Sequence, residues 1–192
     1  QPNAKFHDGK PVTSQDVAFS VLRLKEAHPR GRATFSQVES VDTSDPLVAK
    51  LKLAKPSPGL ITALAASESP IVPKHIFETF KPTENPKTDQ IIGSGPFVLK
   101  EWTPGSHILL EKNADYWDQP RPHLDRVIIR LINDAGARAA ALETGEGDIG
   151  HNPVALSDLE RLKAVPSLKV DDQIYAYAGQ QNQLVINLEN EY

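Results

Sequence analysis

The acidic residues Glu143, Glu146 and Asp148 lie close together after a predicted helix, and they are the first candidates for chemistry. Two carboxylates can act as general acid and general base in a hydrolase. Their position around a helix end and a turn is more typical of solvated surface charges. We therefore expect no enzyme here, and an acid/base hydrolase using these three residues remains an alternative.

Metal, thiol and phosphate chemistry receive little support from the residue types. Cysteine is absent, which excludes disulfides and thiolate ligands. The six histidines show no i, i+4 spacing and no H-E-x-x-H pattern. The segment 93–95, "GSG", lacks the Lys and Ser/Thr of a P-loop and precedes a predicted strand. We expect no metal site and no cofactor.

A predicted strand–helix–strand unit spans residues 126–150. The first strand, "RVIIRLI", is apolar on both faces, as in a sheet that is covered on both sides. Asp134 is expected to cap the helix that follows, and Gly145 to stop it. The short segment "GDIG" at 147–150 would then be a second strand, parallel to the first.

The residues Gly150, His151 and Asn152 follow that second strand and are the predicted ligand-binding residues. Ligands of open α/β sheets bind outside the carboxyl ends of parallel strands. Gly150 would let a solute approach the backbone, while His151 and Asn152 offer hydrogen-bond donors and acceptors. An exposed turn before the next helix is the alternative explanation of this segment.

Two aromatic pairs could offer stacking surfaces to a ligand. Tyr116 and Trp117 lie in a polar loop, where packing over a sheet edge is the more common role. Tyr175 and Tyr177 share one face of a predicted strand, and core packing and a ligand cleft both remain open for them.

The composition indicates a folded chain that does not bind nucleic acid. Of 192 residues, 39% are hydrophobic and 24% are charged, and the formal net charge is −4. This balance is too apolar for a disordered chain. The basic residues form no stripe, so we expect no nucleic-acid partner. No apolar run is long enough to cross a bilayer. Gln1 is not expected to be a natural start, because it is not Met.

The sequence of the first 80 residues predicts a small domain that contains both helices and strands. Thr13 and Asp16 form a capping box at the start of a helix that ends at 28–31. Residues 35–41 and 47–53 are expected to pair as a hairpin. Short helices are predicted at 57–66 and 73–80.

Residues 81–90, "KPTENPKTDQ", are polar and contain proline, so they are the best candidate for a domain boundary. A second hairpin is expected to turn at Pro104-Gly105. Further strands are predicted at 173–177 and 183–188.

The chain resembles the family 5 extracellular solute-binding proteins, which are the receptors of ABC importers for peptides, dipeptides, nickel complexes and related solutes. Four stretches in register carry the resemblance, "FHDGKPVTSQDVAFS", "GSGPFVLKEWTPG", "NADYWDQPRPHLDRVIIR" and "ARAAALETGEGDIG". Members of this family are longer, with sequence before "KFHDG" and a further lobe after the strand that matches "LVINLEN". The resemblance therefore implies a middle fragment of such a receptor.

The fold class implied is α/β plus α+β, part of a type II periplasmic-binding-protein-like lobe with a small α+β sub-domain. The expected domains are a sub-domain at 1–88, an α/β lobe at 89–183 and the start of a hinge at 184–192. Asn187 and Asn190 would lie at that hinge, with a frayed terminus as the alternative.

The function implied is capture of a solute, expected to be a peptide, and its delivery to an ABC permease in the membrane, without covalent chemistry. The expected location is the periplasm or the cell surface. The absent lobe is expected to leave an exposed cleft face that favours self-association. An inactive scaffold fragment is the second alternative, and the sequence does not identify the solute.

Overall fold

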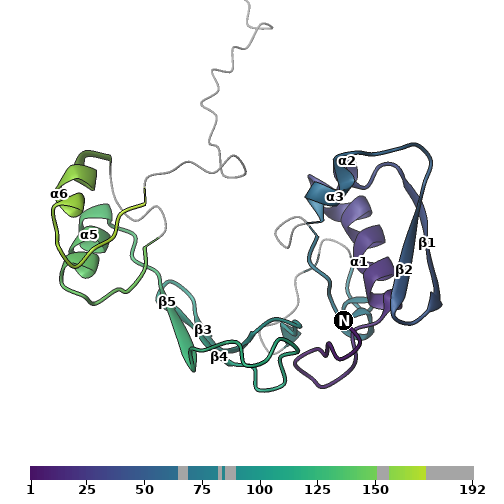
Figure 1. Ribbon diagram of the computed structural model, residues 1–192, viewed down its shortest axis with the longest axis horizontal. Coiled ribbons are helices and arrows are strands. Elements are labelled where there is room, and N and C mark those ends of the chain that lie inside the picture. The colour runs from purple at the N-terminus through teal and green to yellow at the C-terminus, as the bar shows by residue number, and fades with distance from the viewer. Residues whose placement is uncertain (65–68, 82–83, 85–89, 151–155, 172–192) are drawn as a thin grey trace, which may run out of the picture. The chain divides into compact units, whose positions relative to one another are not determined.

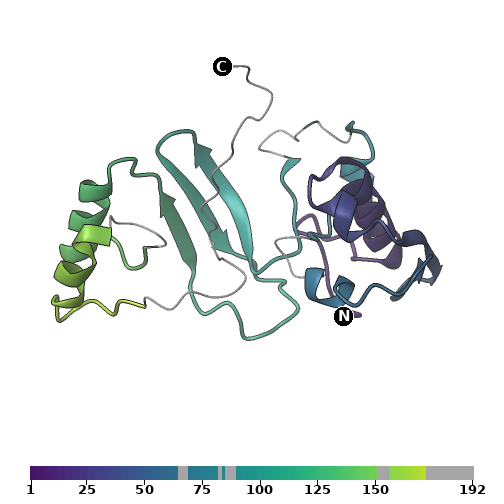
Figure 2. The same ribbon diagram turned by 90° about the horizontal axis from the view of Figure 1, so that it is seen from above.

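The computed structural model describes residues 1–64, 69–81, 84, 90–150 and 156–171. Contacts divide the chain into two compact units, Gln1–Leu131 and Ile132–Tyr192, and each is described by itself. The mixture of helices and sheets confirms the expected α/β plus α+β class at the level of a lobe fragment. Figures 1 and 2 show the helices and strands of each unit.

Helix α1, Ser14–Ala27, begins where the capping box predicts. The Oδ2 atom of Asp16 accepts hydrogen bonds from the Thr13 N–H at 2.9 Å and from the Thr13 hydroxyl at 2.8 Å. These bonds satisfy donors that the first turn of a helix leaves unpaired. The helix ends at His28, whose extended backbone precedes Pro29.

The core of the first unit forms between α1 and the hairpin of β1, Val38–Asp45, and β2, Val48–Leu53. The two strands pair antiparallel, as expected, and α1 lies along them (Figure 1). Val21, Phe35, Val38 and Leu60 are buried together. The short helices α2, Gly31–Thr34, and α3, Leu60–Ala63, complete this layer.

A second set of bonds attaches the segment before helix α4, Lys74–Phe77, to helix α1. Asp16 Oδ1 accepts from the Lys74 N–H at 2.9 Å, and the Ser20 hydroxyl oxygen accepts from the Val72 N–H at 2.9 Å. Asp16 and Ser20 are both buried, so these bonds replace water that the backbone donors have lost.

The second sheet is an antiparallel meander in the order β3-β4-β5. Its strands are β3, Phe97–Thr103, β4, His107–Lys112, and β5, Arg126–Arg130, which lie side by side in Figure 2. The turn between β3 and β4 contains Gly105 with φ of +76°, which confirms the Pro104-Gly105 turn.

The second strand predicted at 147–150 is wrong, whereas its parallel pairing with residues 126–132 would join the two units and stays a prediction. Strand β5 pairs only with β4, antiparallel, among the described residues, and Ile128 and Ile129 are 55% and 43% exposed. Gly147–Gly150 forms no strand. The sequence predicts a strand covered on both faces, but among the described residues β5 lies at the edge of its sheet. The segment "GDIG" is short and glycine-rich, so it has little strand propensity to hold a partner.

Within the second unit, helix α5, Ala135–Glu143, forms as predicted. Asp134 Oδ1 caps it by accepting from the Ala137 N–H at 2.7 Å. Gly145 follows the helix with φ of +75°. A 3₁₀ turn, η2, Leu156–Asp158, leads into α6, Leu159–Lys163. The strands predicted at 173–177 and 183–188 lie outside the described residues.

The domain boundary expected at residues 81–90 stays a prediction. In the described part of the chain no strand pairing joins the β1–β2 hairpin to the β3–β5 sheet. The division of contacts falls after Leu131, and residues 85–89 lie outside the described residues. The sub-domain at 1–88 and the lobe at 89–183 therefore remain proposed domains.

We predict that Asp16→Ala will lower the free energy of unfolding by about 2–4 kcal/mol, because it removes the buried carboxylate that accepts from the partly buried Lys74 and Thr13 N–H groups. Urea denaturation of the 192-residue chain measures this. Asp45→Ala is the matched control, since Asp45 is exposed and accepts one bond, from the Leu47 N–H at 2.8 Å. The control should cost less than about 1 kcal/mol. Equal losses would contradict the role given to Asp16.

Candidate functional site

Of the predicted ligand-binding residues, only Gly150 belongs to the described part of the chain. It is exposed and lies in an irregular segment after Ile149, which is 91% exposed. His151 and Asn152 lie outside the described residues, as do the predicted hinge residues Asn187 and Asn190. These positions stay predictions.

The acidic cluster does not form a paired-carboxylate site. The Glu143 carboxylate forms an ion pair with the Arg161 guanidinium, which also contacts Asp158 at 3.2 Å. Glu146 and Asp148 are exposed. Partly exposed ion pairs of this kind are typical of the charged surface between two neighbouring helices. They give no support to the hydrolase alternative.

A surface hollow of about 480 Å³ lies in the first unit. It is lined by residues 2–5, Pro11, 114–117 and Gln119. The rings of Tyr116 and Trp117 contact each other, with centroids 5.5 Å apart and planes inclined by 49°. The Gln119 amide holds this loop by donating to the backbone oxygens of Ala114 and Tyr116 at 3.1 and 2.9 Å.

Tyr116 and Trp117 line the hollow, which agrees only in part with the packing role that the sequence predicts for them. Trp117 remains 41% exposed, so its ring is only partly used in packing. The wall also carries Lys5 and Asp115, which are exposed. Sequence reasoning missed the hollow because residues 2–5 and 114–117 are brought together by the fold and by no local pattern.

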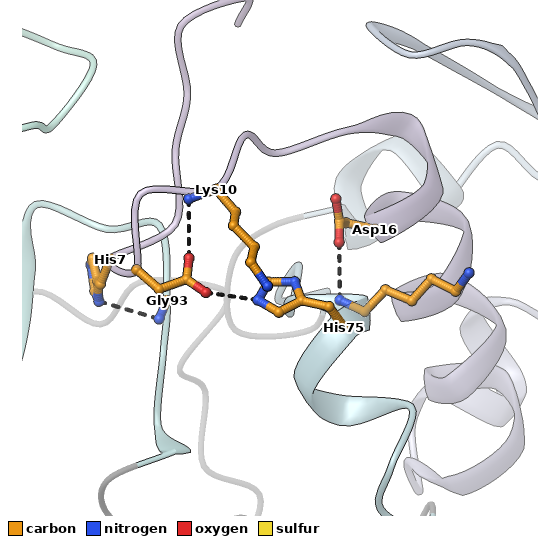
Figure 3. A network of polar contacts seen from close by, with 7 residues as sticks. His7, Lys10, Asp16, His75 and Gly93 are labelled. Carbon is orange, nitrogen blue, oxygen red and sulfur yellow. Dashed lines mark hydrogen bonds and ion pairs between the residues drawn. The ribbon is translucent and has the colours of Figure 1, made fainter.

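A set of polar contacts, the polar junction, connects the turn at residues 7–9 to segment 93–96, which precedes strand β3. The His7 N–H donates to Gly93 O at 2.8 Å, and the Gly93 N–H approaches His7 Nδ1 at 3.2 Å (Figure 3). His7 Nε2 lies 3.1 Å from Gly95 O. These contacts join residues 86 to 88 positions apart.

Asn113 extends this junction to the loop that follows β4. Its side-chain amide donates to Gly95 O at 3.0 Å, and its backbone N–H donates to Pro96 O at 2.9 Å. Asn113 is buried, and its Oδ1 also accepts from the Asp115 N–H at 3.0 Å. We define the polar junction as His7, Gly93, Gly95 and Asn113. It ties together three of the stretches that carry the resemblance.

Next to the junction, Asp8 pairs with His75. Asp8 Oδ2 lies 2.7 Å from His75 Nε2, and Asp8 Oδ1 accepts from the Lys10 N–H at 3.2 Å (Figure 3). Burial alone would raise the pKa of Asp8. The hydrogen bonds from His75 and Lys10 and the charges of both residues outweigh burial, so the pKa of Asp8 is lowered below 3.8.

Neither a metal centre nor a membrane helix occurs among the described residues. No group of three or more His, Cys, Asp or Glu side chains there is arranged to hold a metal ion. None of the helices in that part of the chain combines the length and the apolar character needed to cross a bilayer.

Comparison with protein families gives one match that covers the whole chain. The model described as "Bacterial extracellular solute-binding proteins, family 5 Middle" matches residues 1–192. The oligopeptide-binding protein AppA of Bacillus subtilis strain 168 is 34% identical over 184 residues, covering 91% of this chain and 33% of AppA.

Solved structures agree with this match. The binding protein AgaA of A. tumefaciens R10, in complex with agropinic acid, has a TM-score of 0.73 and is 36% identical. AppA of B. subtilis, in complex with a nonapeptide, has a TM-score of 0.71 and is 33% identical. Each comparison covers 85% of this chain and 33% of the other. The chain thus spans about a third of the length of these relatives.

We predict that Asp8→Asn will destabilise the chain near pH 6 but will have little effect near pH 3. A carboxyl with a lowered folded pKa adds stability above its unfolded pKa of about 4, and that stability is lost as the pH falls through the folded pKa. The expected difference near pH 6 is up to about 1 kcal/mol, since the pair is partly exposed.

Urea midpoints of the wild type and Asp8→Asn at several pH values measure this. Asp115→Asn is the control, because Asp115 is exposed and its carboxylate lies outside the pair. The assignment is wrong if the difference between the wild type and Asp8→Asn stays constant from about pH 6 to about pH 3.

Proposed function

The chain belongs to the bacterial extracellular solute-binding proteins, family 5, and from that membership we propose that it is the middle part of an ABC importer receptor. The receptor captures a solute of the peptide class and delivers it to a membrane permease. The observation that carries the proposal is the match of the family model to all 192 residues, with 34% identity to an oligopeptide-binding protein.

The proposed mechanism is binding without covalent chemistry. The family consists of solute-binding proteins, and no described group of side chains in this chain forms a paired-carboxylate or metal site. Two lobes close on the solute by rotation about a hinge, and the closed form is recognised by the permease. This chain supplies most of one lobe together with its sub-domain.

Within that lobe we propose Gly150, His151 and Asn152 as contacts to the solute, and Asn187 and Asn190 as hinge positions. A family of extracellular proteins supports a location in the periplasm or anchored at the cell surface. The exposed apolar residues of the β3–β5 sheet, among them Trp102 and Ile129, support self-association of the isolated chain.

The solute class is the part of the proposal that experiment must decide. A nonapeptide occupies AppA, and agropinic acid occupies AgaA. Calorimetric titration of the intact protein with short peptides, with opines such as agropinic acid and with nickel complexes would separate these classes. Binding of peptides alone supports the proposal, whereas binding of an opine or a nickel complex alone would replace its substrate class.

We predict that residues 1–192 alone will bind the solute far more weakly than the intact protein. A good small-molecule pocket buries about 70–90% of the ligand, which a single lobe cannot do. If half the contacts of a micromolar site are lost, the remaining affinity lies near the millimolar range. Titration of both proteins with the same peptide measures this, and sedimentation shows whether the isolated chain self-associates. Equal affinities would contradict the two-lobe proposal.

We predict that Asn152→Ala in the intact protein will weaken solute binding about tenfold and leave the melting temperature nearly unchanged, since it removes one polar contact. Asn113→Ala is the matched control. Its amide is buried in the polar junction, so it should lower the melting temperature and leave the affinity nearly unchanged. A lower melting temperature with normal binding for Asn152→Ala would show a structural role.

A further inference from the structure

We propose that His7 is a pH-dependent latch, which holds segment 93–96 to the turn at residues 7–9 by three bonds while its ring is neutral and by two when the ring is charged. The proposal rests on contacts within the first unit and is independent of the proposed function. The latch consists of three bonds between His7 and the backbone of Gly93 and Gly95.

The partners of the ring determine where its proton lies. Gly95 O can only accept a hydrogen bond, so the His7 Nε2 at 3.1 Å must carry the hydrogen. The Gly93 N–H can only donate, so the His7 Nδ1 at 3.2 Å must be unprotonated. Both bonds therefore require the neutral ring with its hydrogen on Nε2.

Protonation breaks one of these bonds. A charged ring carries hydrogens on both nitrogens, and its Nδ1–H would then face the Gly93 N–H, donor against donor. The Nε2–H bond to Gly95 O and the bond from the His7 N–H to Gly93 O both remain. The latch loosens, and the two segments stay attached.

The partners of the ring are uncharged. Segment 91–99 contains no ionisable side chain, and Asn113, which shares Gly95 O, is an amide. The charged residues nearest in sequence are Lys5, Asp8 and Lys10 on the turn, and Lys112 and Asp115 beside Asn113. The Asp8 carboxylate is engaged by His75 and by the Lys10 N–H.

The two histidines that contact this turn respond to acid in opposite directions. A protonated His75 gains attraction to the Asp8 carboxylate 2.7 Å away. A protonated His7 loses its acceptor for Gly93.

The wild-type 192-residue chain provides the first test. Imidazole ¹⁵N spectra at about pH 8 should show His7 with an unprotonated Nδ1 and a protonated Nε2. Hydrogen exchange of the Gly93 amide, corrected for its intrinsic pH dependence, should lose about two- to tenfold of its protection as the ring becomes charged. A ring with its hydrogen on Nδ1, or protection that does not change with pH, would overturn the proposal.

Two variants make the test specific. In His7→Asn the side-chain oxygen takes the position of Nδ1, so protection of Gly93 should persist at every pH. In His7→Gln the amide reaches Gly95 O but leaves Gly93 without an acceptor, so protection should be low at every pH. The exposed His123→Gln is the matched control and should keep the wild-type pH dependence. A pH dependence that survives in His7→Asn would also overturn the proposal.

Discussion

The structure of the first unit depends on satisfying the backbone of residues 93–96 with groups that are distant in sequence. Gly95 O accepts from both His7 and Asn113, and Pro96 O accepts from the Asn113 N–H. A polar backbone group that is shielded from water and left unpaired costs about 1–3 kcal/mol. The polar junction therefore fixes where strand β3 begins relative to the first turn of the chain.

Hydrogen bonds from side chains to distant backbone groups also hold helix α1 in place. Asp16 serves its own helix start through Oδ2 and the backbone of Lys74 through Oδ1. Ser20 adds the bond from the Val72 N–H one turn later. Buried polar contacts of fixed geometry provide rigidity where the apolar core is small. The lobe closure that we propose would need that rigidity.

The elements that the sequence predicted well are those with local signals. Thr13 with Asp16, Asp134 and Gly145 mark helix ends through contacts within a few residues, and each was observed. The strand predicted at 147–150 is not observed, because a short glycine-rich segment has little strand propensity of its own. The junction of His7 with Gly93 joins residues 86 positions apart, so no local pattern could show it. The predicted ligand-binding residues His151 and Asn152 stay predictions because they lie outside the described residues.

The fold of this chain constrains the solute only weakly. AgaA and AppA share its architecture at TM-scores of 0.73 and 0.71, yet one structure holds agropinic acid and the other a nonapeptide. A small polar acid and a long peptide differ in size, charge and number of hydrogen-bonding groups, so side chains lining the cleft must discriminate between them. This chain spans about a third of each relative, and a pocket that buries most of its ligand needs walls from both lobes. Under the proposed function, specificity would therefore be a joint property of this lobe and of the opposite lobe, and the polar junction and the bonds of Asp16 would keep this lobe's share of the wall in place.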